Sequence, residues 1–468
     1  MPVSAFFKRW LPELLLLALL LFVSVRELGT YPAAWSDEGL FIIVAKMIAA
    51  GKGYVLPLLD RTWSYPYFLN VGPALILPVA LSLKLFGTSI EAARTPMVVY
   101  LVLASAAFYA FARKTQGISG ARWATLLLVT LSAYINTGKP VLGEVPAFFF
   151  VMLGLLAWVT LGKHRGWLAG GAFGLAMMTK VTFGLILPAL AVAWTAALLM
   201  KNRNELKHLT IAGVTSAIVF GAWRLVEVMH TLAGGLEDEI RSQLIGSAEQ
   251  TTFLTALRTE PRIFLNLPFL AFGLLLVFAI IGWRASRERM HASARVTLFT
   301  LIILFILYCA LTFGWYRLIL PAHLLLLIFV PAGAMRLLGK RGGAGLMVSI
   351  ALAQGYWLLD HRGSGQSDTA LAMTALVQNE YADTDIVIQQ TEIFARLPEN
   401  PRWHFLMPNL SFSLPKEYNK LSGVWCRMPF LRKLNPQEKL TVSGSIVHEI
   451  GGYQIVAPPY PCPPFPHD

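Results

Sequence analysis

The sequence predicts an all-α polytopic membrane protein of about eleven transmembrane helices, followed by a small α/β domain. Of the 468 residues, 56% are hydrophobic and only 14% are charged, whereas soluble domains carry nearer a quarter charged residues. Several apolar runs reach the length of about 20 residues that a helix needs to cross a bilayer. The alternating pattern of an outer-membrane barrel is absent, so helices are the expected spanning elements.

The first apolar run follows Lys8 and Arg9 and resembles a signal peptide. No small-x-small cleavage site follows it and further apolar runs come after it, so we interpret it as a retained anchor. The predicted spans lie near residues 11–29, 95–112, 121–136, 145–162, 166–179, 181–200, 208–228, 262–283, 294–313, 315–338 and 343–359.

The apolar segment at 68–87 decides the orientation of the chain. Gly72-Pro73 and Pro78 interrupt it. If it is re-entrant or lies along the interface, the N-terminus and the inner loops hold seventeen Lys and Arg but only three acids. If it spans, fifteen of those seventeen move to the other side, against the positive-inside rule. We therefore predict a cytoplasmic N-terminus, an outer C-terminus and a first outer loop (about 30–94) with interfacial helices.

The net charge of +13 belongs to the membrane part of the chain. From residue 360 onward there are nine Lys and Arg against eleven Asp and Glu. The excess therefore follows from topology, and no nucleic-acid partner is expected. A second outer loop is predicted at about 229–261, where Glu237-Asp238-Glu239 form a solvated face.

The predicted domains are a membrane domain at 1–359 and a small soluble domain at 360–468. In the second, residues 368–379 have a helical pattern, and 385–389, 442–447 and 453–456 have strand patterns. The proline-rich end at 458–464 is expected to be extended. Cys426 and Cys462 could pair if this domain is outside the cytoplasm, and Cys309 is expected in the core.

Charged residues converge on the predicted outer face. The acids Asp37 and Glu38 follow the first span, and Glu144 begins the fourth. A carboxylate can act as general base on a hydroxyl, and cations can hold a phosphate leaving group. The cations and the aromatic residue predicted to contact substrate with Glu38 are Arg94, Lys180, Arg317 and Tyr316.

Each of these residues also has a structural explanation. Asp37, Glu38 and Glu144 could be acids at helix starts, where the helix dipole favours them. Lys180 and Arg317 could extend to the membrane interface. Arg94 could pair with Glu91, three residues earlier. A Walker loop, HExxH, a CxxC pair and GxSxG with triad partners are absent from the sequence. No nucleotide-binding fingerprint is visible either, so a nucleotide-sugar donor handled on the cytoplasmic side is not supported.

Five stretches together resemble the GT-C fold glycosyltransferases, in the bacterial branch related to protein O-mannosyltransferases and the lipid A aminoarabinose transferase. Asp37-Glu38 with GLFIIVAKMIAAGKGY resembles the first outer loop of that family. The other stretches are LFGTSIEAAR, GEVPAFFFVMLGLLAW, GLAMMTKVTFGLILPAL and WYRLILPAHLLLL. The resemblance that they carry extends over most of residues 1–338.

The resemblance implies a sugar donor linked to polyprenyl phosphate, used on the periplasmic face of the bacterial inner membrane. It implies that Asp37 is the base and that Lys180 and Arg317 occupy the family's Thr-Lys and late Arg positions. It also makes Glu144 a candidate ligand for a divalent metal. Close relatives carry an acidic or His-Pro-Pro-like motif where this chain has Trp63-Ser64-Tyr65-Pro66-Tyr67, so a metal-independent enzyme is an alternative.

The expected function is therefore inverting transfer of a sugar to a hydroxyl of a lipid, glycan or protein acceptor. Two other classes fit parts of the pattern. A transporter or flippase of lipid-linked sugars would also need charges in its membrane part, although the inverted repeats typical of transporters are not detected. A scaffold that kept the fold and lost catalysis would fit the altered residues at 63–67.

Overall fold

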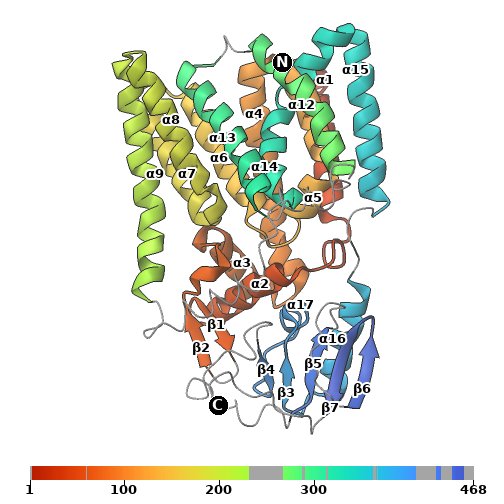
Figure 1. The fold of residues 1–468 in the computed structure, drawn as a ribbon. Helices are drawn as coiled ribbons and strands as arrows, with labels where there is room; N and C mark the ends of the chain where they lie inside the picture. The colour runs from red at the N-terminus through yellow and green to blue at the C-terminus, as the bar shows by residue number, and fades with distance from the viewer. Residues whose placement is uncertain are drawn as a thin grey trace.

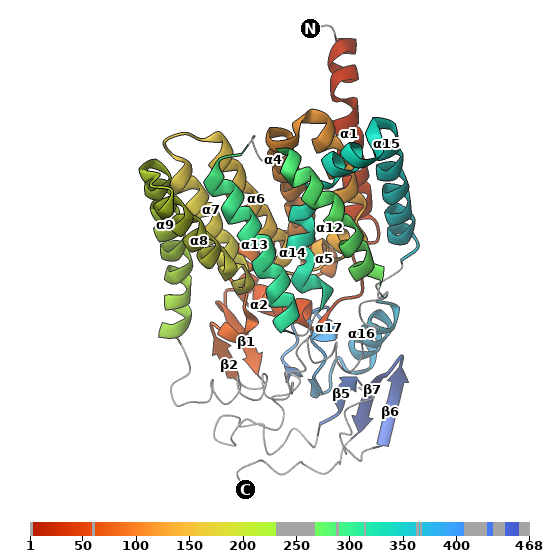
Figure 2. The ribbon, with the colours of Figure 1, turned by 45° about the horizontal axis from the view of Figure 1, so that its top comes forward.

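The computed structural model describes residues 3–58, 61–230, 267–286, 290–312, 315–361, 365, 367–406, 428–433 and 445–457. Long helices form a bundle, and a small sheet lies beyond one end of it (Figure 1). The predicted fold class is confirmed by this mostly helical architecture with a C-terminal sheet. Helix α1 (Val3–Val25) projects from the bundle at the end opposite the sheet (Figure 2).

The helices of the bundle follow the apolar runs of the sequence. Within the described residues, five are long and apolar enough to cross a membrane, and shorter apolar helices accompany them. Apolar side chains on their outer surfaces, such as Leu199 and Leu352, are well exposed, as expected for lipid contact. The protein is therefore a multi-pass membrane protein.

After α1, the described helices of the bundle are α4 (Ile90–Thr130), α5 (Ser132–Gly138), α6 (Glu144–Thr160), α7 (Arg165–Thr179), α8 (Ile186–Leu199), α9 (Arg203–Met229), α12 (Leu267–Ser286), α13 (Ala292–Leu311), α14 (Tyr316–Leu327) and α15 (Val330–Leu359).

Glycines divide two of these long helices. In α4, Gly117 has φ 83°, and the break separates the runs predicted as two spans at 95–112 and 121–136. In α15, Gly339 has φ 71°. Glycine adopts such a conformation without the steric cost of a Cβ. The run predicted as one span at 315–338 is also divided, into α14 and the first part of α15.

The segment predicted as the first outer loop folds against one end of the bundle. It contains α2 (Ser36–Ala49), the hairpin of β1 (Val55–Leu58) and β2 (Arg61–Ser64), a turn of 3-10 helix (Tyr67–Leu69) and α3 (Pro73–Phe86). Figure 1 shows α2 and α3 between the bundle and the sheet. With 14 residues, α3 is not one of the helices of spanning length. Whether 68–87 crosses the membrane stays a prediction, because α6 and α14 are also shorter than 18 residues.

The C-terminal part forms a five-stranded mixed sheet in the order β4-β3-β5-β7-β6. The first three strands in this order are parallel, and β7 pairs antiparallel with β5 and β6. The predicted helix and strands correspond to α16, β3, β6 and β7. The elements are α16 (Asp368–Glu380), β3 (Ile386–Ile388), α17 (Thr391–Phe394), β4 (Trp403–Phe405), β5 (Phe430–Lys433), β6 (Ser445–Ile450) and β7 (Tyr453–Ala457).

Some expectations fall on parts of the chain that the structure does not describe. Cys426, Cys462, the proline-rich end and the acidic residues 237–239 lie outside the described residues. Cys309 is described, and it is buried on α13 as expected.

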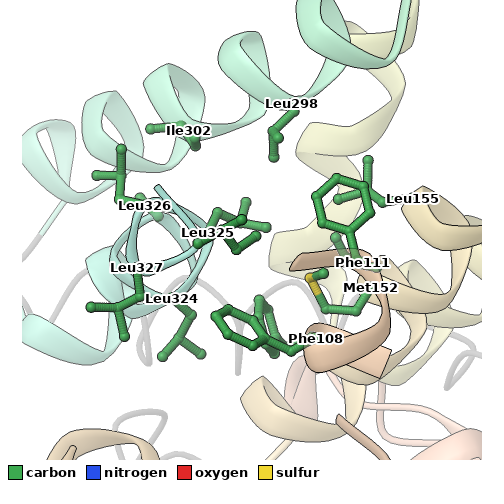
Figure 3. Close-up of a cluster of buried hydrophobic side chains, with 14 of the residues drawn as sticks. Phe108, Phe111, Met152, Leu155, Leu298, Ile302, Leu324, Leu325, Leu326 and Leu327 are labelled. Carbon is green, nitrogen blue, oxygen red and sulfur yellow. The ribbon is translucent and has the colours of Figure 1, made fainter. Parts of the chain in front are cut away.

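The bundle and its end nearest the sheet, called the outer end after the predicted orientation, have separate apolar cores. In the bundle, Phe108 and Phe111 of α4 pack with Met152 of α6 and with leucines of α14 (Figure 3). At the outer end, buried residues of α2 and α3 pack with Ala395 and Phe405 from the C-terminal part. This second core therefore joins two regions that are more than 300 residues apart in the sequence.

Close contact with α17 fixes the position of α2. A Cβ on Gly39 would lie 2.5 Å from the carbonyl carbon of Thr391 and 2.7 Å from the Glu392 nitrogen. Further along α2, the Lys46 ammonium donates hydrogen bonds to the carbonyl oxygens of Phe394 and Leu397. Burial lowers the pKa of Lys46 to about 8. The C-terminal part thus lies directly on the helix that begins at Ser36.

The change Gly39→Ala should separate α17 from α2, because the added methyl group meets backbone atoms that cannot rotate away. Overpacking of this kind costs about 1–3 kcal/mol. We expect a lower unfolding temperature of the purified protein in detergent and faster proteolysis of the C-terminal part. Gly213→Ala is the matched control, because nothing lies within 4 Å of a Cβ there. Equal stability of the two variants would contradict the close contact.

Candidate active site

The first turn of α2 carries two adjacent carboxylates with different environments. Trp35 precedes the helix in an extended conformation, and Asp37 and Glu38 lie in its first turn, where acids interact well with the helix dipole. The Asp37 side chain is 41% exposed, whereas that of Glu38 is fully buried. Successive residues point about 100° apart around a helix, so the two carboxylates face different neighbours.

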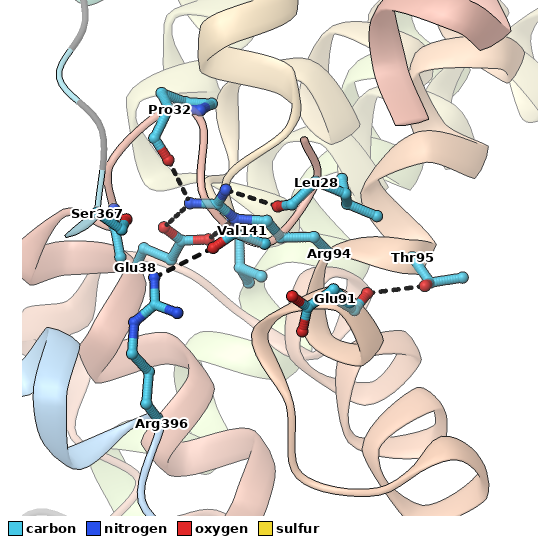
Figure 4. Close-up of polar contacts among 11 residues, drawn as sticks. Leu28, Pro32, Glu38, Glu91, Arg94, Thr95, Val141, Ser367 and Arg396 are labelled. Carbon is cyan, nitrogen blue, oxygen red and sulfur yellow. Dashed lines mark hydrogen bonds and ion pairs between the residues drawn. The ribbon is translucent and has the colours of Figure 1, made fainter. Parts of the chain in front are cut away.

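Glu38 forms a buried ion pair with Arg94 of α4 (Figure 4). Arg94 Nε donates to Glu38 Oε1 and Nη2 to Oε2, both at 2.7 Å. The guanidinium also donates to the carbonyl oxygens of Leu28 and Pro32. The alternative pairing of Arg94 with Glu91 does not occur. The prediction that Glu38 and Arg94 bind substrate stays a prediction, and their burial favours a role in holding α2.

Asp37 pairs with Arg317 at the start of α14. Arg317 Nη1 donates to Asp37 Oδ2 at 2.8 Å. The guanidinium lies over the Trp315 ring at 4.6 Å from its centroid and over the Trp35 ring at 5.5 Å. Such cation–π contacts restrict where the charge can lie. A carboxylate that is accessible to solvent is therefore next to a cation held by two indoles.

Glu144 and Lys180 form the third pair. Glu144 begins α6, Lys180 follows α7, and Lys180 Nζ donates to Glu144 Oε1 at 2.7 Å. Both side chains are buried, and Gly143 allows the stem of Lys180 to pass close to the backbone. The other oxygen, Glu144 Oε2, is buried without a hydrogen-bond partner among the described residues. It is an acceptor that a ligand could satisfy.

Backbone contacts bring these segments together at one end of the bundle. The Val141 nitrogen donates to Glu38 Oε1 at 3.0 Å, which places the segment before Glu144 beside the start of α2. Val71 forms an isolated antiparallel bridge with Lys180. The first outer loop therefore contacts both the Glu38 region and the Lys180 region. Each of the three predicted cations is paired with one of the three predicted acids.

Tyr316 is directed differently from its neighbour Arg317. Its hydroxyl hydrogen-bonds Nδ1 of His323, seven residues later on the same helix. His323 is buried and packs edge-on against Phe272 of α12. The phenol group is therefore engaged with the bundle core, and its predicted contact with substrate stays a prediction.

Residues 63–67 form aromatic packing in place of the acidic or histidine motif expected there. Trp63 is buried against Phe68, and Tyr65 stacks on Tyr54 with ring centroids 5.6 Å apart. Across the described ranges, no group of three or more His, Cys, Asp or Glu side chains is arranged to hold a metal. Glu144 is the candidate ligand, and its Oε1 already accepts from an ammonium. The donor set that is described does not fit a divalent cation.

The sequence did not indicate that the C-terminal part contacts this site. Thr391 Oγ1 donates to the carbonyl oxygen of Ser36 at 2.8 Å, immediately before Asp37. Arg396 donates to the carbonyl oxygen of Gly29, and burial lowers the pKa of its guanidinium (Figure 4). No local pattern around 391–396 marks these residues. Trp35 and Trp315, by contrast, could have been found from their positions beside Asp37 and near Arg317.

Comparisons with known proteins agree with this architecture. A family model described as dolichyl-phosphate-mannose-protein mannosyltransferase matches residues 70–223, less than half of the chain. The structure of ArnT from Cupriavidus metallidurans in the apo state superposes with a TM-score of 0.66 at 15% sequence identity, covering 96% of this chain and 98% of ArnT. The chain has the GT-C fold.

Two ligand-bound structures share the GT-C fold with this chain. ArnT from Cupriavidus metallidurans bound to undecaprenyl phosphate matches with a TM-score of 0.62 and 14% identity, over 95% of this chain and 97% of ArnT. AglB, the oligosaccharyltransferase of Archaeoglobus fulgidus, was solved with an inhibitory peptide and a dolichol-phosphate. It matches with a TM-score of 0.56 and 13% identity, over 86% of this chain and 65% of AglB. No curated protein matches the chain by sequence.

Removing one partner of the Glu38–Arg94 pair should unfold the outer end of this GT-C protein. A buried charge left without its partner typically costs 3–5 kcal/mol. We expect Glu38→Gln to lower the unfolding temperature strongly. The matched control is Glu399→Gln, because the Lys52–Glu399 pair is about half exposed and worth little. Similar effects of the two changes in a thermal unfolding assay would contradict the structural role of Glu38.

Proposed function

We propose that the protein transfers a sugar from a polyprenyl-phosphate-linked donor to an acceptor hydroxyl, with Asp37 as the general base. The observation that carries this proposal is the pairing of a solvent-accessible carboxylate with Arg317 at the outer end of a GT-C bundle. The Glu144–Lys180 pair belongs to the same end. General base catalysis needs an accessible carboxylate, and a phosphate leaving group needs cations beside it.

The proposed donor follows from the cations and from the comparisons. Arg317 and Lys180 present N–H donors that suit phosphate oxygens. The matched structures include one with undecaprenyl phosphate and one with dolichol-phosphate, and the matched family model describes mannosyl transfer from dolichyl phosphate. A lipid-linked donor also suits a site at one end of a bundle of membrane helices.

The reaction proceeds by direct displacement. Asp37 accepts the proton of the acceptor hydroxyl while that oxygen forms a bond to the anomeric carbon of the sugar. The bond from this carbon to the phosphate oxygen breaks, and polyprenyl phosphate leaves with the electron pair. Arg317 and Lys180 stabilise the charge on the leaving phosphate. Because attack and departure occur on opposite sides of one carbon, the configuration inverts.

Glu144 has a supporting role in this scheme. It holds the Lys180 ammonium, and its free Oε2 is available to a hydroxyl of the sugar. No step is assigned to a metal. We place the reaction on the periplasmic face of a bacterial inner membrane, with the N-terminus cytoplasmic. The domain at 1–359 then spans the membrane, and residues 360–468 lie outside.

Replacing Asp37 with Asn should remove the base with little change of shape and slow transfer by about 10²-fold or more. The measurement uses membranes from cells that lack the gene and carry wild-type or variant protein. Release of polyprenyl phosphate from the donor and mass spectrometry of envelope glycans and lipids report the reaction. Asp385→Asn is the control, because this carboxylate lies in the C-terminal part and is about half exposed.

Three results would separate the proposed function from the alternatives. A fully active Asp37→Asn variant would contradict the role of Asp37. If wild-type protein moves lipid-linked sugar across a vesicle membrane without forming a glycosidic bond, it is a transporter. If deletion of the gene leaves every envelope sugar unchanged and purified protein transfers none, the fold has lost its catalytic activity.

A further inference from the structure

We infer that Arg317 is exchanged between Asp37 and the phosphate of the lipid-linked donor, so that donor binding releases the carboxylate that acts as base. This inference rests on the proposed function and adds an order to it. The donor binds before the acceptor is deprotonated. The observation behind it is that a single guanidinium contacts the proposed base in the structure and is also the cation proposed to bind the leaving group.

The guanidinium is confined while its N–H donors stay available. Trp315 and Trp35 lie beside it, and both indoles are about half exposed. Its described ion pair is the bond from Nη1 to Asp37, and its buried Nε has no hydrogen-bond partner in the described part of the chain. A planar guanidinium can donate to two oxygens of one oxyanion at the same time. The phosphate therefore comes to a cation that is already in position.

The exchange places the phosphate on the Nη1–Nη2 edge of Arg317, where it competes with Asp37 for Nη1. While Arg317 Nη1 donates to Asp37 Oδ2, that carboxylate oxygen is occupied and is not open to the proton of a hydroxyl. A phosphate offers more oxygens and more charge than a carboxylate, so it is the stronger partner for Arg. When phosphate takes Nη1 of Arg317, Asp37 loses its partner, and its Oδ2 is open to the proton of the acceptor hydroxyl.

The surroundings permit this exchange. Asp37 is 41% exposed, so its carboxylate can be solvated when Arg317 leaves it. The neighbouring pair of Glu38 and Arg94 is fully buried and keeps α2 in place while the Asp37 contact opens. After transfer, departure of polyprenyl phosphate returns Arg317 to Asp37. The base is then restrained until the next donor arrives.

Equilibrium binding of undecaprenyl phosphate to the purified full-length protein in nanodiscs tests the exchange without any transfer reaction. Asp37→Asn removes the competing charge, so we expect the affinity to rise about fivefold, the factor for losing a partly exposed ion pair. Asp385→Asn removes the same charge elsewhere and should leave the affinity unchanged. Undecaprenol, which lacks the phosphate, should bind equally to all variants and reports that they are folded.

A second background separates exchange from simple repulsion between Asp37 and the phosphate. In the Arg317→Met protein, Asp37 has no guanidinium to bind. Exchange therefore predicts that adding Asp37→Asn does not raise the affinity for undecaprenyl phosphate any further. Repulsion alone predicts that the gain persists there, and this result would overturn the inference. Unchanged affinity of the Asp37→Asn variant would overturn it as well, without touching the proposed reaction. Wild-type protein that binds undecaprenyl phosphate no better than undecaprenol would overturn the proposed donor itself.

Discussion

The buried ion pair between Glu38 and Arg94 is the interaction on which the outer end of the molecule depends. Two unit charges removed from water are costly unless every donor and acceptor is satisfied. Here the two carboxylate oxygens accept from Arg94 and from the Val141 nitrogen, and Arg94 also donates to Leu28 and Pro32. These bonds tie together the end of α1, the start of α2, the start of α4 and the segment before α6. The candidate site is built on that frame.

The sequence indicated the charged residues that the structure brings together in pairs, but not which residues pair. Charged residues in an apolar chain are costly and therefore stand out, and the loop charges indicated which ones share a face. Pairing is a long-range property. Arg94 had a local candidate in Glu91, yet it binds Glu38, 56 residues earlier. Helix limits were also predictable where an apolar run ends. Helix limits were not predictable where a glycine such as Gly117 turns the chain within a helical pattern.

The contact between the C-terminal part and α2 is also a long-range property that the sequence did not predict. Its helix and strands follow from periodicity, because burial of one face imposes a pattern on neighbouring residues. Its position on α2 depends on Gly39, which lets the backbone of α17 approach, and on the hydroxyl of Thr391, which reaches Ser36. Neither residue is unusual in sequence. The result is that a region after the membrane helices helps to hold the turn that carries Asp37.

The adjacent acids Asp37 and Glu38 each form an ion pair with an arginine, but the two pairs differ in their exposure to water. The Glu38–Arg94 pair is excluded from water, and opening it would leave uncompensated buried charges. The Asp37–Arg317 pair is partly exposed, and water can replace either partner at a cost of about 1 kcal/mol or less. The proposed exchange of Arg317 between Asp37 and the donor phosphate needs an ion pair of this partly exposed kind. Burial therefore distinguishes two acids that are adjacent in the sequence.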